Sequence, residues 1–197
     1  MILNNVTKFP IVLIGPPRSG SIVTCRQVGY DLGIKHFFDL TYTKDQTEFN
    51  EFLDFAQYND QYVIKFHSFD IKKYPDWLTN KIYNRSTYNV KIIRKNIISH
   101  VASVYIAEMR NLYHYDNNNL KDYSGPIEIN YKRMITCISR CLSDIDELEK
   151  MPITFDTVII YEEQQYNDEL STKTPLPSNY DKLLTEINRF IRYKKEI

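Results

Sequence analysis

One stretch near the start of the chain, residues 11–23 (IVLIGPPRSGSIV), restricts the fold more than any other. Its first four residues are apolar and predict a buried strand, which Gly15 and the two prolines after it end. A polar turn, residues 18–21, follows, and an apolar-periodic segment that predicts a helix begins at Ile22. Such a turn and the start of such a helix direct their backbone N–H groups at the same place. The stretch therefore predicts a cradle for a phosphate or a similar anion.

The two glycines of this stretch match only the first part of the phosphate-binding loop of nucleotide hydrolases. Gly15 and Gly20 have the required spacing, but the lysine that should follow is replaced by Ser21, and the positive charge lies inside the loop at Arg18. A kinase or GTPase also needs a metal-holding acid at the end of a second strand, and the sequence shows no convincing one. We therefore expect an anionic nucleotide that is bound without magnesium. The alternative is an ordinary strand-to-helix turn with a surface arginine.

The composition is typical of one globular domain. The chain has 197 residues, of which 43% are hydrophobic and 25% are charged, and no linker rich in Pro, Gly or Ser divides it. We therefore expect a single domain over residues 1–197. The formal net charge of zero argues against a general nucleic-acid-binding surface.

The sequence also favours a cytoplasmic protein. No apolar run approaches the ~20 residues of a membrane span, and the first ten residues do not form a signal-peptide pattern. The three cysteines, Cys25, Cys137 and Cys141, have no zinc-site spacing and suit a reducing compartment. We therefore expect no membrane anchor and no metal.

Beyond the first loop, short apolar segments alternate with amphipathic ones. Strands are predicted at residues 11–14, 34–40, 61–66, 88–93 and 155–161, and helices at 22–32, from Thr43 or Asp45 to about Tyr58, after Pro75, and at 96–113, 127–151 and 180–194. Short strands separated by helices predict a three-layer α/β/α fold with a central, mostly parallel five-stranded sheet and a P-loop-like phosphate-binding turn. Segments 115–126 and 170–179 are predicted to be irregular.

Polar residues follow four of the five predicted strands. Arg18 comes after the first strand, His67 after the third and Arg94 after the fourth, and Tyr161 closes the fifth. Ligands of parallel sheets bind at the carboxyl ends of the strands. The sequence therefore predicts one site at that edge of the sheet.

Four segments of the chain resemble the sulfotransferases that use 3′-phosphoadenosine 5′-phosphosulfate (PAPS). In the family's order they are PRSGS at 17–21, VIKFH at 63–67, IIRKNIISHVASVY at 92–105 and VIIYEE at 158–163. The resemblance implies transfer of a sulfuryl group from PAPS to a hydroxyl or amine acceptor, with 3′,5′-ADP as the second product and no metal.

The resemblance also implies a role for each matching residue. The catalytic residues would be His67 as the base, Arg18 at the oxygen that bridges sulfur and phosphorus, and Lys65 at the sulfuryl oxygens. The nucleotide would be held by Pro17, Arg18, Ser19, Gly20, Ser21, Ile22, Arg94, Ser99, Ser103 and Tyr161.

The chemistry of these residues leaves alternatives open. Histidine titrates near neutral pH, so His67 suits a base, and its alternative is a structural role at the strand end. Lys65 lies on the same strand face as His67 and either holds sulfuryl oxygens or is solvated. Family spacing favours Ser103 for the 3′-phosphate, whereas Ser99 lies nearer the helix start or simply caps it. Tyr161 contacts the adenine region or packs in the core.

The sequence departs from the family pattern after the loop and near its end. Ile22 replaces the usual threonine, Val23 replaces a common aromatic residue, and the late glycine-rich PAPS-binding segment is absent, so the chain is similar to compact bacterial or viral members. The segments 70–86 and 107–134 suit a hydroxylated small molecule or a glycan as acceptor. The alternatives are a small-molecule phosphotransferase and a non-catalytic nucleotide-binding protein of the same fold.

Overall fold

The computed structural model describes residues 2–3, 6–39, 46–68, 76–111, 124–167 and 175–195. The chain forms two compact units: Met1–Lys95 with Asp144–Leu170, and Asn96–Ser143 with Ser171–Ile197. The first unit contains the whole sheet, whereas the regular structure of the second is helical. No helix within the described ranges is long and apolar enough to cross a membrane.

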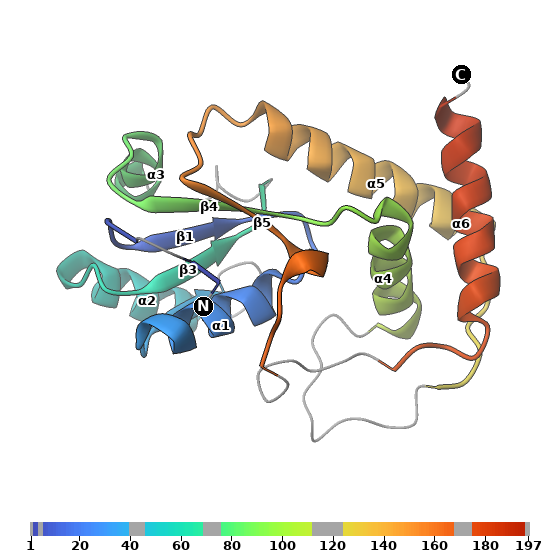
Figure 1. Ribbon diagram of the computed structural model, residues 1–197, viewed down its shortest axis with the longest axis horizontal. Coiled ribbons are helices and arrows are strands. Elements are labelled where there is room, and N and C mark those ends of the chain that lie inside the picture. The colour runs from blue at the N-terminus through green and yellow to red at the C-terminus, as the bar shows by residue number, and fades with distance from the viewer. Residues whose placement is uncertain are drawn as a thin grey trace. The chain divides into compact units, whose positions relative to one another are not determined.

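A five-stranded parallel sheet forms the centre of the first unit (Figure 1). Its strands lie in the order β2-β3-β1-β4-β5. Ile14, the last residue of β1, pairs with Phe66 at the end of β3 and with Lys91 of β4, so the three middle strands end at one edge. The strands are β1 (Ile11–Ile14), β2 (Phe37–Asp39), β3 (Val63–Phe66), β4 (Tyr88–Ile93) and β5 (Thr157–Ile160).

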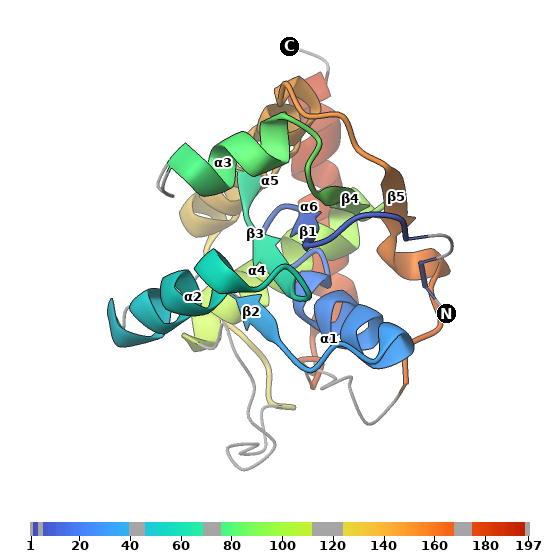
Figure 2. The ribbon, with the colours of Figure 1, turned by 90° about the vertical axis from the view of Figure 1, so that its left-hand side faces the viewer.

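Helices cover both faces of this sheet. Helix α1 (Ser21–Leu32) lies on one face, where Cys25 and Val28 join the apolar side chains of β1 and β4. Helices α2 (Gln46–Tyr58) and α3 (Asp76–Tyr83) lie on the other face, where they pack on Ile64 and its neighbours (Figure 2). The predicted three-layer α/β/α fold with a parallel five-stranded sheet is therefore confirmed.

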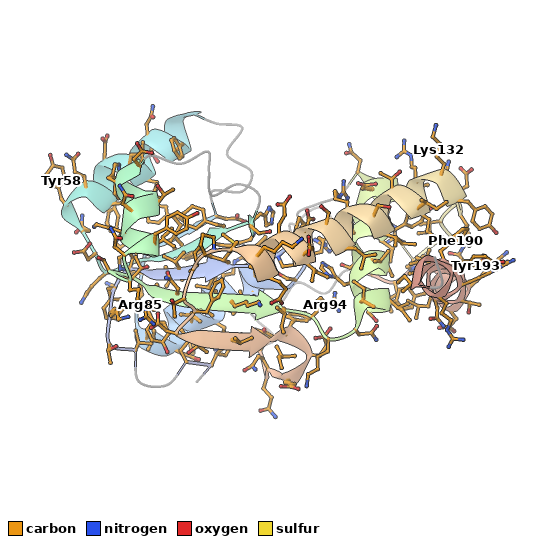
Figure 3. All side chains as sticks on the ribbon, turned by 90° about the horizontal axis from the view of Figure 1, so that it is seen from above. Tyr58, Arg85, Arg94, Lys132, Phe190 and Tyr193 are labelled. Carbon is orange, nitrogen blue, oxygen red and sulfur yellow. The ribbon has the colours of Figure 1, made fainter. Side chains whose placement is uncertain are left out.

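The second unit has an apolar core of its own. Helices α4 (Ile97–Arg110) and α6 (Tyr180–Lys195) share this core with the first part of α5 (Tyr131–Lys150), which continues into the first unit after Ser143. The exposed ring of Tyr131 on α5 packs beside that of Phe190 on α6, with centroids 5.8 Å apart. Figure 3 labels Phe190 on α6.

The predicted elements are present, with shifts at some ends. Helix α5 begins at Tyr131, not at Ile127 as predicted, because the Asn130 side chain accepts the N–H of Arg133 at 3.1 Å and caps the helix there. Strand β5 ends at Ile160, and Tyr161–Glu163 form a 3₁₀ turn where the sequence predicted strand through residue 161. The predicted caps Thr43 and Asp45, and residues 115–123 and 170–174 of the predicted irregular segments, lie outside the described residues.

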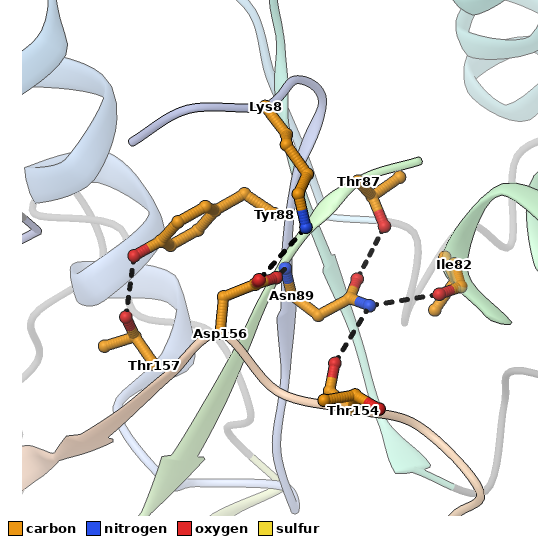
Figure 4. Close-up of polar contacts among 8 residues, drawn as sticks. All are labelled: Lys8, Ile82, Thr87, Tyr88, Asn89, Thr154, Asp156 and Thr157. Atoms are coloured by element: carbon orange, nitrogen blue, oxygen red, sulfur yellow. Dashed lines mark hydrogen bonds and ion pairs between the residues drawn. The ribbon is translucent and has the colours of Figure 1, made fainter. Parts of the chain in front are cut away.

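A buried polar network joins β4 and β5 at their amino ends (Figure 4). The side chain of Asn89, which is fully buried, accepts from the Thr87 hydroxyl at 2.6 Å and donates to the carbonyl of Ile82 at 3.0 Å. The Asn89 N–H donates to the carboxylate of Asp156 at 2.9 Å, and this carboxylate also pairs with Lys8. The network fixes the register of the two strands at the edge opposite the predicted site.

Candidate functional site

The loop between β1 and α1 is a tight turn whose centre is a buried serine. The Ser19 N–H donates to the carbonyl of Pro16 at 3.2 Å, and Arg18 and Gly20 both adopt left-handed backbone angles, with φ of 60° and 82°. The Ser19 hydroxyl is buried and has no hydrogen-bond partner among the described residues. The N-cap of α1 is Gly20, which has no side chain to cap the first N–H groups of the helix. The turn thus holds donors that an anion can satisfy.

Gly15 allows the start of this loop to lie directly against β4. A Cβ atom at Gly15 would lie 2.8 Å from the carbonyl oxygen of Ile92 and 2.8 Å from the Ser19 hydroxyl oxygen. The Gly15 N–H donates to the carbonyl of Phe66 at the end of β3. The turn is therefore held against both neighbours of β1.

The ring of Tyr161 connects the loop to the ends of β4 and β5. It lies so close to Gly20 that a Cβ atom there would be 2.0 Å from a ring carbon. The guanidinium of Arg94 lies over the same ring, 5.1 Å from its centroid, and the ring of Tyr166 packs beside it with centroids 5.3 Å apart. The Tyr166 hydroxyl in turn hydrogen-bonds that of Thr24 on α1 at 2.9 Å. The structure thus brings together Gly20, Arg94 and Tyr161, which the sequence placed in three separate motifs.

A carboxylate that the sequence analysis did not single out occupies the end of β4. Arg94 Nε donates to Glu162 Oε1 at 3.0 Å, and the Lys95 N–H donates to Glu162 Oε2 at 3.0 Å. The ammonium of Lys95 pairs with Glu163. Partial burial by itself raises the pKa of Glu162, but the hydrogen bonds from Arg94 and Lys95 hold that pKa below its ordinary value. Figure 3 labels Arg94 at this strand end.

Lys65 is buried and paired, so the alternative of a solvated lysine is wrong. Its side chain is 3% exposed, and Nζ lies 3.1 and 3.3 Å from the carboxylate oxygens of Asp39, its partner in the β2–β3 register. Burial lowers the pKa of Lys65, while Asp39 raises it and the nearby charge of Arg18 lowers it further. Burial, with a contribution from Asp39, raises the pKa of Cys25 to about 12. Asp39, which ends β2, was missed because a lone acid in a short strand carries no distinctive pattern.

His67 lies at a strand end, whereas the two serines predicted for the 3′-phosphate lie on a helix. His67 follows β3 and is 2% exposed. Ser99 and Ser103 lie on α4 in the second unit. The N-cap of α4 is Asn96, whose side chain accepts the Ser99 N–H at 3.0 Å, so the alternative of Ser99 as the capping residue is wrong. The predicted phosphate contact of either serine stays a prediction.

The carboxyl edge of the sheet thus gathers groups that suit an anion. Arg18, Lys65 and Arg94 lie at the ends of three adjacent strands, and the acids Asp39 and Glu162 each neutralise one of these cations. No protein-family model matches the chain, and no curated protein matches it.

Proposed function

We propose that the protein is a sulfotransferase that moves a sulfuryl group from PAPS to a hydroxyl or amine of a small-molecule or glycan acceptor. One observation supports the proposal most. Gly20 of the first loop, Arg94 after β4 and Tyr161 after β5 come from three separate sulfotransferase-like segments and lie in contact around one aromatic ring. The sheet order places the residues after β1, β4 and β5 side by side, and in this chain those residues are ones that suit a nucleotide.

The 5′-phosphosulfate would bind at the loop between β1 and α1. The Ser19 hydroxyl, buried and without a partner among the described residues, and the uncapped start of α1 would donate to its oxygens. Arg18, inside the loop, keeps its charge at any physiological pH. It would act electrostatically on the charge that builds up on the bridging oxygen as the sulfur–oxygen bond breaks.

The 3′-phosphate would bind at the end of β4. The guanidinium of Arg94 and the backbone N–H of Lys95 already donate to a carboxylate there, which indicates that both groups can bind an anion. ATP and GTP have no phosphate at the 3′ position, so this contact would distinguish PAPS from the common nucleotides.

The transfer itself needs a base and a leaving group. The acceptor oxygen would form a bond to sulfur, the bond from sulfur to the bridging oxygen would break, and 3′,5′-ADP would leave with the electron pair. The acceptor's proton would pass to His67, whose burial at the end of β3 restricts the access of competing water.

Turnover of PAPS by wild-type protein and by His67→Ala tests this proposal. Release of 3′,5′-ADP is measured with a panel of phenols, sugars and amines, and the wild-type rate should rise with pH between about 5 and 8, the range in which histidine loses its proton. His67→Ala should lower the rate by about 10²–10⁴ and remove this pH dependence. The affinity for 3′,5′-ADP should stay unchanged, because the imidazole would face the acceptor.

Arg18→Ala is the second variant in this assay. It should lower the rate by about 10²–10³, as the loss of one donor to a developing negative charge does. It should also weaken PAPS more than 3′,5′-ADP, since only PAPS carries the sulfate. A His67→Ala protein with the wild-type rate and pH profile would contradict the assigned base. Tight binding of 3′,5′-ADP without turnover of any acceptor would favour a non-catalytic nucleotide-binding protein.

A further inference from the structure

The carboxylate of Glu162 makes the two contacts that a phosphate at the end of β4 would make. One oxygen accepts from Arg94 Nε and the other from the Lys95 N–H, both at 3.0 Å. A phosphate bound by these residues would use the same side-chain donor and the same backbone donor. The carboxylate and the phosphate therefore cannot both occupy these donors.

We propose that the carboxylate of Glu162 competes with the 3′-phosphate of the nucleotide. In the free protein the carboxylate accepts from Arg94 and Lys95, and the 3′-phosphate displaces it when the nucleotide binds. This inference rests on the proposed function, because it assumes that the 3′-phosphate binds at Arg94. A phosphate monoester carries about −1.5 to −2 charges near neutral pH, against one for a carboxylate. A phosphate thus gains more from Arg94 than Glu162 loses. A nucleotide that lacks the 3′-phosphate cannot displace the carboxylate in this way.

The surroundings of Glu162 allow this exchange. Its side chain is 29% exposed and belongs to the 3₁₀ turn Tyr161–Glu163, which starts without a side-chain cap. The neighbouring Tyr161 packs on Gly20 and anchors the turn to the loop. The carboxylate can therefore rotate toward solvent through its own side-chain torsions while the backbone of the turn stays in place.

Internal competition would also serve specificity. In the free protein Glu162 neutralises Arg94 and keeps it in position beside the Tyr161 ring. Other anions must then compete with this ion pair for the guanidinium. Competition from the carboxylate weakens the binding of every anion at this position. The most highly charged anion retains the most favourable net binding free energy. Such a repulsive element is a usual means of discrimination between similar ligands.

Calorimetric titration of 3′,5′-ADP and of 5′-AMP tests the inference. The proteins are wild type, Glu162→Gln and the matched control Glu163→Gln. The control removes the same charge one residue away, from a carboxylate that pairs with the Lys95 side chain. Glu162→Gln should bind 3′,5′-ADP about fivefold to twentyfold more tightly than wild type. It should bind 5′-AMP with the same affinity as wild type. Glu163→Gln should leave the ratio of the two affinities unchanged.

Glu162→Ala is a second variant, because a glutamine amide can keep one of the two hydrogen bonds. It should also prefer 3′,5′-ADP more strongly than wild type does, and thermal melting checks that each variant is folded. Weaker binding of 3′,5′-ADP by either Glu162 variant, or an equal gain in Glu163→Gln, would overturn the inference but not the proposed function. A wild-type protein and variants that bind 3′,5′-ADP no better than 5′-AMP would overturn both.

Discussion

At the scale of single residues, the pair of Lys65 and Asp39 is the most costly feature of the site. A buried lysine keeps its charge only if a carboxylate compensates for the lost hydration. Lys65 is 3% exposed, and its partner Asp39 is 25% exposed, so the aspartate retains some solvation while the ammonium depends on the pair. The pair therefore keeps a charged ammonium buried near Arg18, with Asp39 compensating its charge.

Asp39→Asn should destabilise the protein by about 3 kcal/mol at pH 7, because it leaves the Lys65 charge buried without its carboxylate. The substitution also lowers the folded-state pKa of Lys65 further, since Asp39 makes the largest contribution that raises this pKa. Between the folded and unfolded pKa values the unfolded state binds more protons, so stability rises with pH. The loss relative to wild type should therefore shrink between pH 7 and pH 9.5 in urea unfolding.

The matched control is Asp60→Asn, which removes an exposed ion pair with Lys81 of similar length, 3.0 Å against 3.1 Å. It should change the free energy of unfolding by less than about 0.5 kcal/mol at either pH. A loss in Asp39→Asn that is the same at both pH values would show that the Lys65 charge does not carry the effect.

At the scale of elements, the Tyr161 ring couples the loop after β1 to the end of β5. Gly20→Ala should cost about 1–2 kcal/mol from the left-handed backbone and more from the overlap with this ring. Gly33→Ala is the control, because Gly33 has a φ of 67° with nothing within 4 Å of the added Cβ. Chemical denaturation should show a larger loss for Gly20→Ala than for Gly33→Ala.

The same comparison in a Tyr161→Ala background isolates the contact between the elements. Without the ring, the cost of Gly20→Ala should fall to that of Gly33→Ala, and the coupling energy of this cycle measures the contact. A cost for Gly20→Ala that does not depend on Tyr161 would mean that the loop and β5 are not coupled through this ring.

The elements themselves were largely predictable from the sequence. Residues 11–14 are an apolar run, residues 88–93 are mostly apolar with Asn89 and Lys91 among them, and both are strands with the predicted ends. The first helix was predicted to end at Leu32, and α1 ends there, capped by Gly33 with a left-handed φ. The start of α5 was missed because apolar residues at 127 and 129 continue the pattern of the helix, whereas the Asn130 cap decides where it begins.

The partners within the site were not predictable in the same way. Arg94 follows one recognisable strand and Lys65 lies in another, but their carboxylates come from Glu162 and Asp39, which are distant in sequence. Ion pairs between strands depend on sheet order and register, and a single sequence does not reveal either. The acidic pair at 162–163 belongs to one of the sulfotransferase-like segments, but the resemblance assigned neither acid a role.

At the scale of the whole molecule, the sheet order explains why so many charged groups meet at one edge. Strand β1 lies in the centre with β3 and β4 on either side, so the residues that follow these three strands are neighbours. The hydrogen bonds of buried Asn89 join β4 and β5 at their amino ends, which is the sheet edge opposite these groups. The first unit thus separates a fixed amino edge from a charged carboxyl edge, as parallel sheets that bind ligands do.

The melting temperature in the presence of nucleotides tests the central claim most directly. A ligand that binds only the folded state at 100 times its Kd adds about 2.7 kcal/mol to stability. The proposal predicts that 3′,5′-ADP raises the melting temperature of wild type by several degrees, that ATP with Mg²⁺ does so much less, and that Arg94→Ala loses most of the shift. Stabilisation by ATP with Mg²⁺, and none by 3′,5′-ADP, would contradict the assignment to PAPS-dependent sulfuryl transfer.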